Sequence, residues 1–223
     1  MSSNEILIDV PLRTVRSRNW SPGATLLLAG GPVLVFLSEV IAPRQPDDLS
    51  PAQDAAFVIG NSDRLLVSWL VGLVAAAVLA AAFVLVSTRL TGRGKIVGRV
   101  AAVLGVAGAI GLGGHMATEL LVRDLLLQDA GAASTIAEAE FGVAAVSTVF
   151  PVIFGMTLAL ILIAVAAFRA DWVGWWVIVV AVLAFVADWS PTGWATTLFA
   201  ALATIVLGAI ATPRSDKSAR RLD

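Results

Sequence analysis

The chain has 223 residues, of which 58% are hydrophobic and 14% are charged, with a formal net charge of −1. Soluble domains usually carry about 25% charged residues, so this composition excludes an ordinary water-soluble globule and predicts a helical protein that crosses a membrane several times. The absence of cysteine excludes disulfides and thiolate chemistry, the absence of tyrosine excludes phenolic acids, and a single histidine excludes a bis-histidine haem.

Six apolar runs are long enough to cross the bilayer core, which needs roughly 20 helical residues. Backbone polar groups cannot stay unpaired in lipid, so each run is predicted to be a helix and the fold an all-α bundle of six transmembrane spans. The predicted spans are 24–42, 65–87, 100–120, 141–168, 172–187 and 193–212. Together they form a transmembrane domain over residues 22–212, between an N-terminal segment, 1–21, and a basic tail, 213–223.

Helix-capping residues mark further boundaries along the chain. Ser21 precedes a proline and is a typical N-cap for the first span. Ser50, followed by proline and then Gln53, predicts a short extra helix that Gly60 would end. The helical period of the third span continues through residues 118–131, which predicts a protruding or membrane-surface helix. Together with the short helix, this extension is expected to form a small cap.

Asp171 is the predicted N-cap residue of the fifth span. Proline lies near the middle of the first and fourth spans, at Pro32 and Pro151. A proline kink in each span explains this pattern, and an inverted repeat of two three-span halves, as in some transporters, is the alternative.

Basic residues are distributed asymmetrically among the predicted loops. Twelve of the 15 Lys and Arg residues fall before the first span, between spans two and three or four and five, or after span six. The other loops hold only Arg44, Arg64 and Arg123, together with most of the carboxylates. Because Lys and Arg accumulate on cytoplasmic loops, both termini are predicted to be cytoplasmic and the protein to lie in the inner membrane. The basic tail is expected to contact lipid headgroups rather than nucleic acid.

The third span carries a stripe of small residues at intervals of four, which lets another helix approach closely. The stripe consists of Ala101, Gly105, Ala109 and Gly113. Such a stripe predicts intimate packing either within the chain or between subunits of a homo-oligomer.

A candidate polar site is predicted near the outer ends of the spans. His115 and Glu119 are spaced by one helical turn, and Glu39 and Asp188 fall at a similar depth when the residues are counted from the span starts. Three interpretations remain open: an outer rim in which these groups hydrogen-bond each other or water, an external cation or proton site, and a catalytic site. No cofactor and no resident metal is predicted.

The order of features resembles a known group of proteins. The acidic stretch "SEVIAPRQPDD", the second span "NSDRLLVSWLVGLVAAA" and the basic turn "TRLTGRGKIVGR" occur in sequence. This pattern is similar to that of small six-span membrane proteins of unknown function in high-GC actinobacteria. Trp69 departs from it, because relatives often carry histidine there. The resemblance implies an inner-membrane protein and carries over no site residues.

Three classes of function follow from these features. A non-enzymatic accessory or interaction protein is favoured, because no charged residue falls at mid-depth in the predicted spans. A small-solute or ion transporter would need a polar path there. A membrane enzyme would need His115, Glu119, Glu39 and Asp188 to come together.

Overall fold

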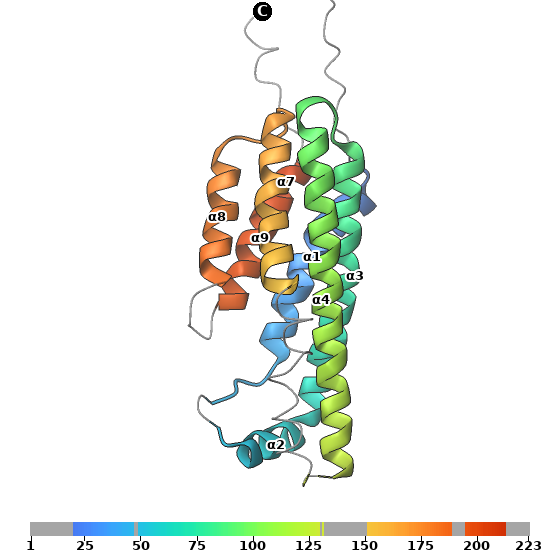
Figure 1. Ribbon diagram of the computed structural model, residues 1–223, viewed down its shortest axis with the longest axis vertical. Coiled ribbons are helices and arrows are strands. Elements are labelled where there is room, and N and C mark those ends of the chain that lie inside the picture. The colour runs from blue at the N-terminus through green and yellow to red at the C-terminus, as the bar shows by residue number, and fades with distance from the viewer. Residues whose placement is uncertain (1–19, 47–48, 130, 132–150, 189–194, 213–223) are drawn as a thin grey trace, which may run out of the picture.

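The computed structural model describes residues 20–46, 49–129, 131, 151–188 and 195–212. Within these ranges every secondary-structure element is a helix (Figure 1). The elements are α1 (Pro22–Ile41), α2 (Pro51–Gly60), α3 (Ser62–Arg89), the 3₁₀ turn η1 (Gly92–Gly94), α4 (Lys95–Gln128), the π-helical turn η3 (Pro151–Met156), α7 (Thr157–Arg169), α8 (Trp176–Asp188) and α9 (Ala195–Ala211).

The predicted caps of the first two helices are confirmed. The Ser21 hydroxyl accepts a hydrogen bond from the backbone N–H of Ala24 at 3.3 Å. Ser50 and Gln53 form a complete capping box at the start of α2, and this helix ends at Gly60. The extension beyond the third apolar run is also helical, because α4 continues to Gln128. With 34 residues, α4 is about 51 Å long, well beyond the thickness of a bilayer core of about 30 Å.

The helices pack into a closed ring. In chain order α1 packs against α3, α3 against α4, α4 against η3 and α7, α7 against α8, and α8 against α9, while α9 returns to pack against α1. Figure 1 shows these helices side by side along the long axis. Most neighbours in the ring are also neighbours in the sequence, whereas the contact between α9 and α1 joins the two ends of the ring, and smaller contacts of η1 and α3 with α7 also join distant segments.

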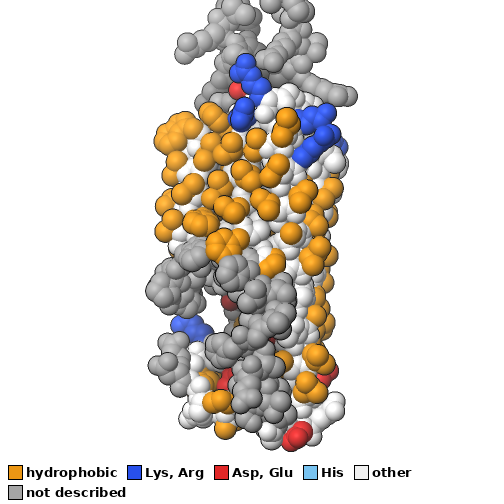
Figure 2. All heavy atoms as spheres, viewed as in Figure 1, with side chains coloured by type: hydrophobic (Ala, Val, Ile, Leu, Met, Phe, Trp, Pro, Cys, Tyr) orange, Lys and Arg blue, Asp and Glu red, His pale blue; other side chains and the backbone are white. Residues whose placement is uncertain are grey.

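Three helical segments are long and apolar enough to cross a membrane: Pro22–Ile41, Ser62–Arg89 and Gly92–Gln128. Three further apolar segments in the described part are shorter, Phe154–Arg169, Trp176–Ala187 and Thr196–Ala211. Large hydrophobic side chains cover the outside of the bundle as well as its core (Figure 2). An apolar surface of this extent marks contact with lipid or with other proteins rather than with water.

The predicted N-cap at Asp171 is wrong, because α8 begins at Trp176. Asp171 has a positive φ of 59° and follows the last residues of α7. The N–H of Trp172 donates to the carbonyl of Ala167, and the N–H of Asp171 donates to that of Phe168. These two bonds form a Schellman motif, so Asp171 occupies the left-handed position that closes α7, where glycine is usual and aspartate is tolerated.

The two prolines have different local effects. Pro32 lies inside α1, which continues without interruption from Pro22 to Ile41. Pro151 begins the π-helical turn η3, which leads directly into α7. The N-terminal part of the predicted fourth span, residues 141–150, lies outside the described residues.

Candidate functional site

The candidate site is built around His115 and Glu119 on α4. The His115 Nδ1 atom lies 3.8 Å from Glu119 Oε1, and the two side chains are 41% and 26% exposed. This separation is too long for a hydrogen bond, so the pair attracts only when the imidazole is protonated. Half-exposed pairs of this kind contribute little to stability. The pair is therefore not required for the fold.

The orientation of the pair follows from the helical period. Gly108 lies two turns before His115 and therefore on the same face of α4. This face packs against η3, because a β-carbon added to Gly108 would lie 2.6 Å from the backbone nitrogen of Met156. His115 consequently lies on the face of α4 that contacts η3, two turns closer to the end of the bundle that holds α2.

The other two predicted site residues do not complete a ligand set in the described structure. Glu39 is exposed near the end of α1. Helix α3 packs against both α1 and α4, so it separates the helix that carries Glu39 from the helix that carries His115. Asp188 is the last residue of α8, and its side chain lies outside the described residues. Among the side chains that are described, no three histidine or carboxylate groups come close enough together to hold a metal ion. The arrangement of His115 and Glu119 thus offers two ligands and does not gain Glu39 as a third.

Hydrogen bonds that no sequence pattern predicted join α1, α3 and α4 at the end of the bundle that holds α2. The buried Ser68 hydroxyl donates to the Ser38 carbonyl at 2.8 Å and links α3 to α1. Arg64 donates to the Ile41 carbonyl, and Arg123 donates to the Ser62 carbonyl, each at 3.0 Å. Of the three acceptors, the Ile41 carbonyl lies at the C-terminal end of a helix, where carbonyls lack intrahelical partners, and the Ser38 carbonyl also accepts from the N–H of Ala42. No local sequence signal predicts them, because both partners of each bond lie on different helices.

The predicted small cap is present at one end of the bundle. Helix α2 packs against α3 and α4, and it lies beside the end of α4 that extends past the rest of the bundle (Figure 1). On that extension Leu121, Leu125 and Leu127 are 60%, 43% and 47% exposed. The cap therefore presents apolar side chains next to charged residues such as Asp124.

The small-residue stripe of α4 faces α3 within the same chain. Ala101, Gly105 and Ala109 are buried. A β-carbon on Gly105 would overlap the ring of Phe83, and one on Gly113 would lie 3.7 Å from the β-carbon of Ala76. The structure therefore places this stripe in an intramolecular contact.

A second, tighter contact joins α4 to η3. A β-carbon on Gly155 would lie 2.9 Å from the Leu104 carbonyl oxygen and 3.0 Å from the Gly108 nitrogen. The two glycines, Gly108 and Gly155, thus let two backbones touch. The four-residue repeat that reveals the stripe facing α3 does not include Gly108, because that residue lies on a different face of α4.

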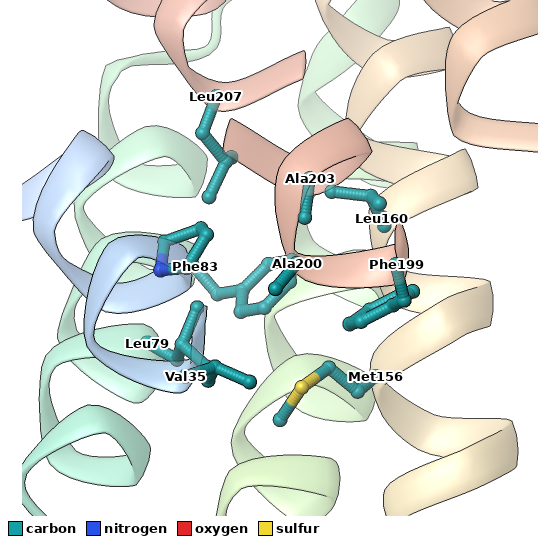
Figure 3. Close-up of a pocket in the computed structure, with 10 residues that line it drawn as sticks. Val35, Leu79, Phe83, Met156, Leu160, Phe199, Ala200, Ala203 and Leu207 are labelled. Carbon is teal, nitrogen blue, oxygen red and sulfur yellow. The ribbon is translucent and has the colours of Figure 1, made fainter. Parts of the chain in front are cut away.

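The centre of the ring is apolar. A small space of about 10 Å³, no larger than a water molecule needs, lies between α1, α3, α9 and the η3–α7 segment (Figure 3). It is lined by Pro32, Val35, Leu79, Phe83, Met156, Leu160, Phe199, Ala200, Ala203 and Leu207. None of these side chains offers a charge or a hydrogen-bonding group to a solute. Among the residues that the structure describes, the buried polar side chains are Ser38, Ser68 and Thr157.

An aromatic cluster closes the opposite end of the ring. The Trp20 indole N–H donates to the Ile210 carbonyl at 3.2 Å, which joins the start of α1 to the end of α9. The rings of Trp20 and Trp172 meet edge to face, with centroids 6.0 Å apart. The Arg89 guanidinium lies 5.4 Å from the centroid of the Trp20 ring. Three other parts of the fold therefore hold Trp20 in place.

Comparison of the chain with known proteins finds no matching family model, no matching curated protein and no matching solved structure. The resemblance to six-span actinobacterial membrane proteins therefore stays a prediction.

Proposed function

We propose that this protein is an integral protein of the inner membrane whose six helical segments all cross the bilayer, with both termini in the cytoplasm. We further propose that it works without catalysis, as an accessory or interaction protein that binds another membrane protein or a second copy of itself. The observation that carries this proposal is a closed ring of helices whose described interior is apolar and whose described exterior is also apolar.

Six spans are supported by the way the shorter helices pack. The segments η3–α7, α8 and α9 complete the ring with the three long helices, and they expose large apolar side chains such as Val182, Val186 and Ile205 to the outside. Side chains of this kind are stable against lipid and costly against water. A bilayer that surrounds the three long helices would therefore surround the other helices of the ring as well.

The orientation is supported by the segregation of charge. In the described part, Arg89, Arg93, Lys95, Arg99 and Arg169 lie at the end that holds the α3–α4 turn, where Asp171 is the only described carboxylate. Figure 2 shows most of the blue side chains gathered at this end, with a red group among them, and most of the red ones at the other end, where a blue group also lies. The end that carries the basic residues is the expected cytoplasmic side.

The accessory role is supported by what lies inside the ring and by the outer cap. An ion or proton path would leave ionisable groups at mid-depth, whereas the buried polar groups Ser38 and Ser68 donate to backbone carbonyls. The extension of α4 meanwhile exposes leucines beyond the bundle. An exposed apolar surface rimmed by charge is typical of a protein-binding surface.

The topology is tested by cysteine accessibility, for which the cysteine-free chain provides a background without labelling. Thr91, Asp171, Gly60 and Gln128 are all exposed and are each replaced singly by cysteine. In intact cells, an impermeant maleimide is expected to label Gly60→Cys and Gln128→Cys. Thr91→Cys and Asp171→Cys are expected to react only after permeabilisation. Labelling of Asp171→Cys in intact cells would contradict the six-span arrangement.

The accessory role is tested by photo-crosslinking in native membranes. A maleimide photo-crosslinker at Leu125→Cys, on the exposed face of the α4 extension, is expected to capture a membrane protein or a second copy of the chain. The matched control is Ile110→Cys, which is 70% exposed in the middle of α4 and is expected to yield lipid adducts only. If both positions gave lipid adducts alone, the interaction role would be rejected while the topology would stand.

A further inference from the structure

Four basic side chains at one end of the bundle lack partners in the described structure. Arg93, Lys95, Arg99 and Arg169 are exposed, and none of them forms a salt bridge or a hydrogen bond with a described residue. The arginines at the opposite end behave differently, since Arg64 and Arg123 donate to backbone carbonyls. Cations that are free of internal partners remain available to an external anion.

The fold holds the two distant segments that carry Arg93, Lys95 and Arg169 against each other, and Arg99 follows Lys95 by one turn on the same face of α4. Gly94 packs directly against α7, where a β-carbon would overlap the Ala166 carbonyl and lie 3.3 Å from the Ala170 β-carbon. Arg93 and Lys95 flank Gly94 in the chain, and Arg169 directly precedes Ala170. The backbone contact at Gly94 therefore holds the basic α3–α4 turn against the basic end of α7.

The same region marks the boundary of the apolar surface. Ile96 is 76% exposed next to Lys95, and Trp175 and Trp176 are 68% and 47% exposed just after the α7–α8 turn. Exposed indoles are typical of the membrane interface, at the level of the lipid headgroups. The four cations thus lie where phosphate groups of the bilayer are found. Arg89 is excluded from the set, because its guanidinium lies over the Trp20 ring.

We propose that Arg93, Lys95, Arg99 and Arg169 form a binding site for the phosphate headgroups of anionic phospholipids in the inner leaflet. This inference rests on the proposed membrane location. Guanidinium groups bind phosphate oxygens through paired, charge-assisted hydrogen bonds, and the ammonium of Lys95 adds a further point charge. The acyl chains of a bound lipid would lie along the apolar surface beside Ile96.

The experiment measures lipid retention by the full chain. The protein is reconstituted into nanodiscs of equal phosphatidylglycerol and phosphatidylcholine, extracted gently, and analysed by native mass spectrometry. Retained phosphatidylglycerol is expected to exceed phosphatidylcholine. Since each interfacial cation changes affinity for an anionic surface by roughly fivefold, the double variant R93Q/R169Q is expected to lower this preference by about 25-fold.

The matched control removes the same number of arginines from the opposite end, as R64Q/R123Q, and is expected to keep the preference. Equal loss in both double variants, or no preference in the natural chain, would overturn the site. Inorganic phosphate distinguishes a lipid from a free anion: displacement of phosphatidylglycerol by millimolar phosphate would overturn the lipid assignment. A chain that fails to enter nanodiscs at all would contradict the proposed function itself, whereas an inserted chain without lipid preference would contradict only this inference.

Discussion

Replacing Gly108 with leucine is expected to lower the unfolding free energy of the bundle by about 3 kcal/mol. The new side chain would begin 2.6 Å from the backbone nitrogen of Met156 and 3.0 Å from its Cα atom. Backbone atoms cannot rotate away, so α4 and η3 would have to separate. The gain from replacing glycine in a helix, about 1 kcal/mol, is too small to compensate. Reversible denaturation of the purified protein in detergent micelles measures the difference.

Two comparisons make this prediction specific. Gly113→Ala is expected to be neutral or slightly stabilising, because its β-carbon would make an ordinary contact of 3.7 Å with Ala76. Gly105→Ala is expected to destabilise, but the addition of Phe83→Leu should restore part of the loss, because the obstacle there is a side chain. A stable Gly108→Leu variant would show that the two backbones do not touch.

Replacing Trp20 with alanine is expected to cost about 3 kcal/mol of unfolding free energy. The substitution removes the hydrogen bond to Ile210, the edge-to-face contact with Trp172 and the cation–π contact with Arg89. Each of these interactions contributes about 1 kcal/mol. All three hold the first helix against the end of the ring, so the variant should separate α1 from α9 before the rest of the bundle unfolds.

The control for Trp20 is another tryptophan at the same end. Trp175 is 68% exposed, and Trp175→Ala is expected to change stability by less than about 0.5 kcal/mol. Trp20→Phe should lose the hydrogen bond but keep a ring beside Trp172, and should therefore fall between these two variants. Equal stability of the Trp20→Ala and Trp175→Ala proteins would refute the role of Trp20 in closing the ring.

Local chemistry made several features predictable from the sequence. Ser21 and Ser50 cap helices through hydrogen bonds to residues that lie only three positions away, so a short pattern contains both partners. The all-helical structure follows similarly from composition and the length of the apolar runs. Asp171 was misassigned because the same residue type that caps a helix start also tolerates the left-handed conformation that closes a helix end.

The positions of the candidate site residues relative to one another could not be predicted from the sequence. Counting residues along a helix gives the depth of Glu39, His115 and Glu119, but it does not give their positions around the ring. His115 and Glu119 share a face because they lie on one helix, whereas the place of Glu39 depends on α3 lying against both α1 and α4. The contact of Gly108 with Gly155 was unpredictable for the same reason, since it depends on which helix becomes the neighbour of α4.

The bond between Trp20 and Ile210 spans 190 positions of the chain. Until α9 has been synthesised, the face of α1 that packs against α9 has no protein to cover it, and the ring of helices stays open between α1 and α8. Closing long loops makes such a step slow, and open intermediates are the species that associate wrongly. A chain interrupted before α9 would therefore leave the surfaces of α1 and α8 that pack against α9 uncovered.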